Sequence, residues 1–135
     1  MTTNDTDTIE MSWILAASPE EVYAAWLSGE GHAAMTGGAA EVDARAGGAF
    51  TAWDGYIRGV TTELEEGRRI VQTWRTAEFA DGAPDSRIEV RLRAHGEGTQ
   101  LTLRHTGLAP GDGAKYTTGW YEHYLTPMVD YFGSK

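Results

Sequence analysis

The strongest constraint on the fold comes from a helical pattern near the C-terminus, in residues 114–132. Its apolar residues recur at helical spacing, namely Trp120, Tyr124 and Met128 every four residues, with Tyr121, Leu125 and Phe132 beside them. This period predicts a helix with a broad apolar and aromatic stripe on one side. Such a stripe needs an apolar surface to cover it, so the rest of the chain has to supply that surface.

Pro127 falls inside this predicted helix. Proline removes one backbone donor and frees the carbonyl of the residue four positions earlier, here His123. We therefore expect a kink. A kinked aromatic helix packs imperfectly, and a kink that opens space beneath Met128 would favour a binding cavity.

The first part of the chain predicts one strand followed by short helices. Residues 8–16 mix β-branched and aromatic residues with partial alternation, which is typical of a strand. Ser18 as N-cap, Pro19 in the first turn and Glu21 three residues after the cap form a helix-start signal with a capping box. Residues 30–36 predict a second, shorter helical turn.

From Ala39 onward the hydrophobic period changes to two, which predicts a series of antiparallel strands. The expected strands are residues 40–43, 49–53, 56–64, 69–75, 86–94 and 99–106. Asp54-Gly55 predicts a two-residue hairpin between the second and third of them. The resulting order, with the long helix last, is an α+β layout in which a curved sheet of about six or seven strands wraps around the C-terminal helix.

Length and charge limit the classes of function. With 135 residues we expect one domain over residues 8–135, preceded by a disordered tail at residues 1–7. A net charge of −9 argues against nucleic acid and anionic membranes as partners. Arg87, Arg91 and Arg93 alternate with apolar residues and are interpreted as the solvated face of a strand. No membrane span or signal peptide is predicted, so a cytoplasmic location is expected.

The sequence offers no metal site, cofactor motif or catalytic constellation. Cysteine is absent, and the four histidines lack ligand spacing: they are His32, His95, His105 and His123. His105 is the best single candidate for chemistry, because alternation places it on the face of Leu101 and Leu103, towards the final helix. The competing interpretation is a strand-end histidine that hydrogen-bonds a loop carbonyl or a tyrosine hydroxyl.

Several segments together resemble the family of activator of heat-shock-protein-90 ATPase homologues. They are Gly47-Gly48-Ala49-Phe50, Trp53-Asp54-Gly55-Tyr56 with Gly59, Glu63-Leu64, Arg69 to Arg75, Gly98-Thr99 with Leu101 and Leu103, His105-Thr106-Gly107, and Gly119-Trp120-Tyr121 with Tyr124 and Tyr131-Phe132. The resemblance spans roughly residues 9–133. It implies the START/Bet v 1-like (SRPBCC) superfamily and its helix-grip fold, which often encloses an apolar cavity.

Seven residues are expected to line such a cavity, between the sheet and the final helix: Trp26, Phe50, Trp74, His105, Trp120, Tyr124 and Met128. Pockets for small molecules are mostly apolar with a few placed polar groups. The first hypothesis is therefore a non-catalytic protein that binds a small apolar or aromatic molecule. The second is a co-chaperone-like protein that modulates a heat-shock chaperone ATPase, and the third is a cavity enzyme such as a cyclase or hydrolase. A monomer or weak dimer is expected.

Overall fold

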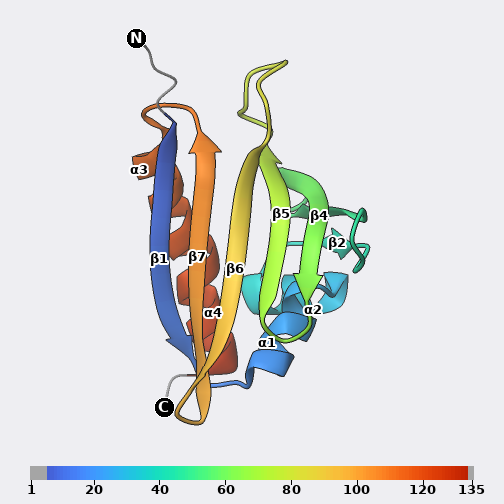
Figure 1. Ribbon diagram of the computed structural model, residues 1–135, viewed down its shortest axis with the longest axis vertical. Coiled ribbons are helices and arrows are strands. Elements are labelled where there is room, and N and C mark those ends of the chain that lie inside the picture. The colour runs from blue at the N-terminus through green and yellow to red at the C-terminus, as the bar shows by residue number, and fades with distance from the viewer. Residues whose placement is uncertain (1–5, 134–135) are drawn as a thin grey trace.

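The computed structural model describes residues 6–133, and within this range seven antiparallel strands form one sheet in the order β1-β7-β6-β5-β4-β3-β2 (Figure 1). The strands are β1 (Asp7–Leu15), β2 (Glu41–Val42), β3 (Ala49–Ala52), β4 (Ile57–Glu65), β5 (Arg69–Thr76), β6 (Ser86–His95) and β7 (Gly98–Leu108). Residues 1–5 of the expected tail lie outside the described residues, and Asp7 already belongs to β1. The predicted α+β layout is confirmed.

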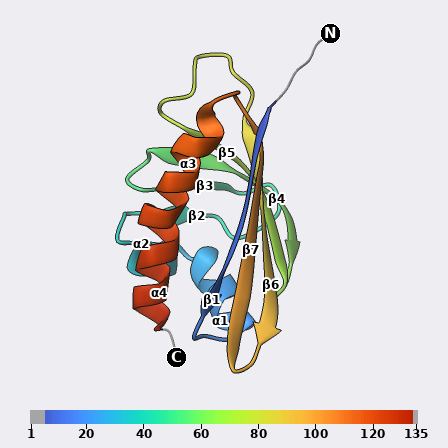
Figure 2. The same ribbon diagram turned by 90° about the vertical axis from the view of Figure 1, so that its left-hand side faces the viewer.

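The helices cover one face of this sheet. They are α1 (Pro19–Trp26), α2 (Gly29–Thr36) and a continuous C-terminal helical segment of α3 (Asp112–Trp120), η1 (Tyr121–Leu125) and α4 (Thr126–Phe132). Figure 2 shows the C-terminal segment running beside the sheet, with β2 and β3 reaching towards it. The long stripe-bearing helix is thus held by the sheet, as in a helix-grip fold.

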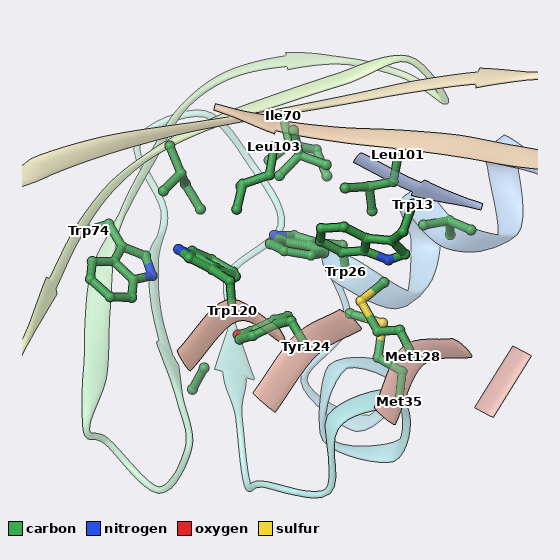
Figure 3. Packing of buried hydrophobic residues seen from close by; sticks show 14 of the residues in the cluster. Trp13, Trp26, Met35, Ile70, Trp74, Leu101, Leu103, Trp120, Tyr124 and Met128 are labelled. Atoms are coloured by element: carbon green, nitrogen blue, oxygen red, sulfur yellow. The ribbon is translucent and has the colours of Figure 1, made fainter. Parts of the chain in front are cut away.

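The hydrophobic periods predicted which side chains are buried. Leu101, Leu103 and His105 on β7 are all 0% exposed. Trp120, Tyr124 and Met128 pack against that face of the sheet as a buried stripe (Figure 3). Tyr121 was expected beside the stripe, but it is 48% exposed, because the stripe is narrower than the pattern suggested. Arg87, Arg91 and Arg93 lie exposed on the outer face, as predicted.

Helix α1 begins as its sequence signal predicts. The Ser18 hydroxyl accepts from the Glu21 backbone N–H at 3.1 Å, and the Glu21 carboxylate accepts from the Ser18 N–H at 3.1 Å. This reciprocal capping box satisfies two backbone donors at the helix start. The cap fixes the orientation of Val22 and Trp26, which point into the core.

The Asp54-Gly55 hairpin prediction is wrong in loop length. Ala52 on β3 pairs with Ile57 on β4, so four residues connect the strands, and Trp53, Asp54 and Gly55 all have positive φ. The Asp54 side chain and backbone N–H are both bound to Ala39, at 3.2 and 3.0 Å. These contacts to a distant segment stabilise a wider loop than two residues would form.

Pro127 changes the helix type rather than ending the helix. The N–H of Thr126 bonds the carbonyl of Tyr121, five residues back, so η1 is a π-helical turn. A proline ring collides with the carbonyl four residues earlier in an α-helix, and the wider turn just before Pro127 accommodates it. Met128, directly after Pro127, is 0% exposed and packs in the core cluster, and the open pocket described below does not reach it.

Candidate functional site

The candidate site is an open pocket of about 390 Å³ between the C-terminal helical segment and the β3–β4 loop. Its lining is mostly aromatic: Trp53, Tyr56, Ile57, Trp74, Lys115, Tyr116, Thr118, Gly119, Trp120, Glu122, His123 and Tyr124. This volume lies within the range of small-molecule sites, roughly 300 to 1,000 Å³. The pocket lies two helical turns before Met128, at the point where α3 passes into η1.

The helix side of the pocket depends on the π turn and on one glycine. Three consecutive residues of η1, Glu122, His123 and Tyr124, all line the pocket, since a π turn is wider than an α turn. Gly119 lines it one turn earlier, and a Cβ at this position would have no other atom within 4 Å. π turns are often found at functional sites, and the missing side chain of Gly119 adds space.

On the loop side, the pocket is lined by Trp53, whose backbone conformation is strained. Trp53 has a φ of 52°, a conformation that is unusual for a bulky side chain. Its ring lies so close to Gly38 that a Cβ there would be 2.4 Å from it, and it meets the His123 ring at 4.9 Å between centroids. Its buried Nε1–H has no hydrogen-bond partner among the described residues. Strain and unpaired polar groups concentrate at functional sites.

A polar cluster holds the rim of the pocket. The Tyr56 hydroxyl donates to the Glu78 carboxylate at 2.5 Å, and the Lys115 ammonium donates to the other Glu78 oxygen. Burial and then the Glu78 carboxylate raise the pKa of Tyr56 to about 12. The Lys115 hydrogen bond holds the pKa of the Glu78 carboxyl below its usual value. The cluster ties together the β3–β4 loop, the segment after β5 and helix α3.

His105 is a fully bonded core residue behind the pocket. The Trp120 indole N–H donates to its Nδ1 at 3.0 Å, and indole is only a donor, so the proton of the neutral ring is on Nε2. Nε2–H then donates to the Ser86 hydroxyl at 2.8 Å, which donates to the Trp74 carbonyl at 2.6 Å. Burial lowers the pKa of His105 to about 3. This chain of bonds fixes Trp120 and Trp74, two walls of the pocket.

A second buried histidine, His32 on α2, fixes Tyr124 in the same way. Its Nδ1–H donates to the Trp26 carbonyl at 2.9 Å, so Nε2 accepts from the Tyr124 hydroxyl at 2.6 Å. Burial lowers the pKa of His32 and raises that of Tyr124. The sequence around His32 does not indicate this role, because its partner Tyr124 lies 92 residues away.

The structure divides the seven predicted site residues into two groups. Trp74, Trp120 and Tyr124 line the pocket. The other four lie in the core and do not line it: they are Trp26, Phe50, His105 and Met128. Periodicity identified them as inward-facing, but most inward positions are filled by neighbours.

Several lining residues were not predicted from the sequence, among them Trp53, Tyr56, Gly119 and His123. Two of them carried a usable signal. Gly119 interrupts a helical pattern with a residue of poor helix propensity, and Trp53 is a bulky residue directly before a turn. Tyr56 and His123 become pocket residues only through the fold.

Within residues 6–133, no group of three or more histidine, aspartate or glutamate side chains could hold a metal ion. The same part of the chain contains no helix that is long and apolar enough to cross a membrane.

Comparison with known proteins gives one consistent family. The family model described as "Activator of Hsp90 ATPase homolog 1-like protein" matches residues 16–133. The human protein named activator of 90 kDa heat shock protein ATPase homolog 1 is 28% identical over 116 residues, which are 86% of this chain and 34% of that protein. The chain thus spans about a third of the length of the curated relatives it matches.

Two solved structures illustrate the shared fold. The crystal structure of an HSP90 activator from Plasmodium falciparum has a TM-score of 0.81 at 23% identity, covering 91% of this chain and 94% of its own. CalU16 from Micromonospora echinospora has a TM-score of 0.78 at 25% identity, covering 93% of this chain and 76% of its own.

Proposed function

This chain belongs to the family of activator of Hsp90 ATPase homolog 1-like proteins, and within that family we propose that it is a non-catalytic binding protein. It holds a small apolar or aromatic molecule in the pocket between η1 and the β3–β4 loop. The observation that carries the proposal is the pocket wall, in which six of the twelve lining residues are tryptophan or tyrosine. Aromatic rings supply large apolar contact area at low conformational cost.

Two further observations support a pocket that is maintained rather than accidental. Its walls are fixed from behind by two hydrogen-bonded histidines, because His105 holds Trp120 and His32 holds Tyr124. On its loop side, Trp53 has a positive φ and an unpaired indole N–H, and both features lower the stability of the fold. A rigid site of this kind loses little entropy when a ligand binds.

The test is native mass spectrometry of the protein purified from its own host, with a variant that fills the pocket. Gly119→Leu places a side chain into open space, so the variant is expected to fold and to lose the bound molecule. Thr126→Leu is the matched control, because Thr126 is exposed on the same helix and does not line the pocket. A small molecule present in the wild type and in Thr126→Leu, but absent from Gly119→Leu, supports the proposal. Wild-type protein that carries no small molecule contradicts it.

A second candidate function is modulation of a heat-shock chaperone ATPase, which the name of the human relative favours. That relative is about three times as long as the matched part, so its activity as a whole protein does not transfer directly. The ATPase rate of the 90 kDa chaperone from the same host, measured with and without this chain, tests the candidate. An unchanged rate at saturating concentrations would count against it. The expected cytoplasmic location and the expected monomer or weak dimer stay predictions.

A further inference from the structure

A second cleft lies on the outer face of the sheet, the face that the helices leave uncovered. In Figure 1 the helices lie behind the sheet, so this face is turned towards the viewer. The volume of the cleft is about 320 Å³, at the lower end of the range for small-molecule sites, roughly 300 to 1,000 Å³. Four of its eight lining residues are arginines, namely Arg68, Arg69, Arg91 and Arg93, and only Glu65 is acidic.

This concentration of positive charge contrasts with the rest of the chain. Acidic residues outnumber lysines and arginines by 20 to 11, yet four of those 11 line this one cleft. The backbone brings them together, because the Leu92 N–H donates to the Arg68 carbonyl at 2.8 Å. The turn between β4 and β5 therefore lies against β6 at the residue between Arg91 and Arg93.

Carboxylates neutralise one side of the cleft. The Arg69 guanidinium bonds Glu63 at 2.8 Å, Glu65 at 3.0 Å and Glu89 at 2.5 Å. Glu89 also pairs with Arg91 at 3.0 Å. These bonds offset the repulsion between Arg69 and Arg91, which lie directly opposite each other on β5 and β6. Arg69 is thus held within the sheet by its own carboxylate partners.

The other side of the cleft is not neutralised. Arg68 and Arg93 are exposed and make no ion pair within residues 6–133. On β7, Gln100 lies opposite Arg93 and Thr102 lies opposite Arg91, so uncharged hydrogen-bonding side chains stand beside the guanidinium groups. Donors from the β4–β5 turn, from β6 and from β7 therefore border one volume.

This arrangement favours a compact anion with oxygens in several directions. Guanidinium groups bind both phosphate and carboxylate through pairs of N–H donors. A tetrahedral phosphate presents its oxygens to donors on several sides, whereas a carboxylate presents two oxygens in one plane. A long polyanion would also cover acidic parts of a chain with a net charge of −9. A compact group interacts mainly with charges within a Debye length of about 8 Å.

We propose that this cleft binds the phosphate group of a small phosphorylated molecule. Arg68 and Arg93 are its main contacts, and Arg91, Gln100 and Thr102 complete the site from β6 and β7. The cleft lies across the sheet from the aromatic pocket, so the inference goes beyond the proposed binding function and does not depend on it.

The test is an NMR titration of the ¹⁵N-labelled full chain with inorganic phosphate near pH 7.5, at constant ionic strength. We expect saturable shifts of the Leu92, Gln100 and Thr102 backbone N–H signals. A Kd of about 1 mM would leave the site about 90% occupied at about 10 mM phosphate. The absence of saturable shifts up to that concentration overturns the proposal.

Malonate is the matched probe, because it carries a similar charge on two planar carboxylates. We expect it to bind about fivefold more weakly than phosphate, the effect of losing about one hydrogen bond. Equal or tighter binding of malonate overturns the phosphate class and assigns the cleft to carboxylates, such as those of an acidic protein segment.

Arg93→Gln is expected to weaken phosphate binding about tenfold, because one charge-assisted contact is lost. Arg87→Gln is the matched control, since Arg87 is also an exposed arginine of β6 without an ion pair in the described chain and does not line the cleft. Equal weakening in both variants would show a response to overall charge and overturn the site. None of these results bears on the aromatic pocket, which native mass spectrometry tests separately.

Discussion

The two buried histidines make the stability of this fold depend on pH below about 6.5. Burial lowers the pKa of His32 and that of His105, the latter to about 3, whereas a histidine in an unfolded chain titrates near 6.5, the reference value. Between about 3 and 6.5 the imidazole of His105 is neutral in the native state and protonated in the unfolded state, and the lowered pKa of His32 acts in the same direction. Unfolding therefore takes up protons, and the free energy of unfolding falls as the pH falls.

The size of this effect on the free energy of unfolding follows from the difference between the histidine pKa values in the folded and unfolded states. With its pKa lowered to about 3, His105 lowers the free energy of unfolding by about 1.36 kcal/mol per pH unit below 6.5. For His105 the loss is about 2 kcal/mol at pH 5, and His32 acts in the same direction. Ordinary carboxylates titrate near pH 4, so the range from pH 7 to pH 5 isolates the histidines.

The assay is urea unfolding followed by tryptophan fluorescence at several pH values between 7.5 and 5. The slope of the unfolding free energy against pH gives the number of protons taken up on unfolding. His105 is expected to contribute about one near pH 5.5, and His32 adds in the same direction. His105→Gln keeps one acceptor and one donor for Trp120 and Ser86, and is expected to lower that number by about one. His95→Gln, which removes an exposed histidine at the end of β6, keeps both buried histidines and their slope. A wild-type free energy of unfolding that stays constant from pH 7 to 5 would show that the buried histidines do not take up protons on unfolding.

Three further predictions concern the pocket and its support. Gly119→Ala is expected to raise the free energy of unfolding by about 1 kcal/mol and the melting temperature by about 3 to 5 °C, because alanine is the better helix former and its Cβ meets no atom. Calorimetry measures this change. In the control Gly113→Ala the new Cβ would lie 3.0 Å from the Asp7 carboxylate, so this variant should give a smaller gain or a loss. Trp120→Phe leaves the Nδ1 atom of His105 without its donor and is expected to lower the free energy of unfolding in urea by about 1 to 3 kcal/mol. Tyr121→Phe, at an exposed position of the same helix, is the control. A smaller loss for Trp120→Phe than for Tyr121→Phe would contradict the assigned tautomer. Glu78→Ala is expected to lower the pKa of Tyr56 from about 12, since the carboxylate is lost as acceptor and as charge; ultraviolet titration of the phenol tests this, and an unchanged titration would show that burial alone sets the value.

The sequence was informative wherever a period or a local signal decides the structure. Alternation in residues 86–94 and 99–106 predicted β6 and β7 closely, and the Ser18 signal predicted the start of α1. These features depend on neighbours within a few residues. The prediction of a two-residue turn at Asp54-Gly55 was wrong because non-local contacts decide this loop: the bonds of Asp54 with Ala39 widen it.

For the site, the sequence alone predicts which aromatic side chains point inward, because a period of two or four fixes the side of an element on which a residue lies. It could not determine which of them face empty space. Trp26, Phe50 and Met128 are covered by neighbours, whereas Trp74, Trp120 and Tyr124 border the pocket.

That difference arises from contacts between elements that lie far apart in the sequence. It depends on the loop conformation of Trp53, on the π turn before Pro127 and on hydrogen bonds such as that between His32 and Tyr124, 92 residues apart. A pocket is the volume that packing leaves unfilled, so it is set by distances between elements rather than by the pattern within any one of them.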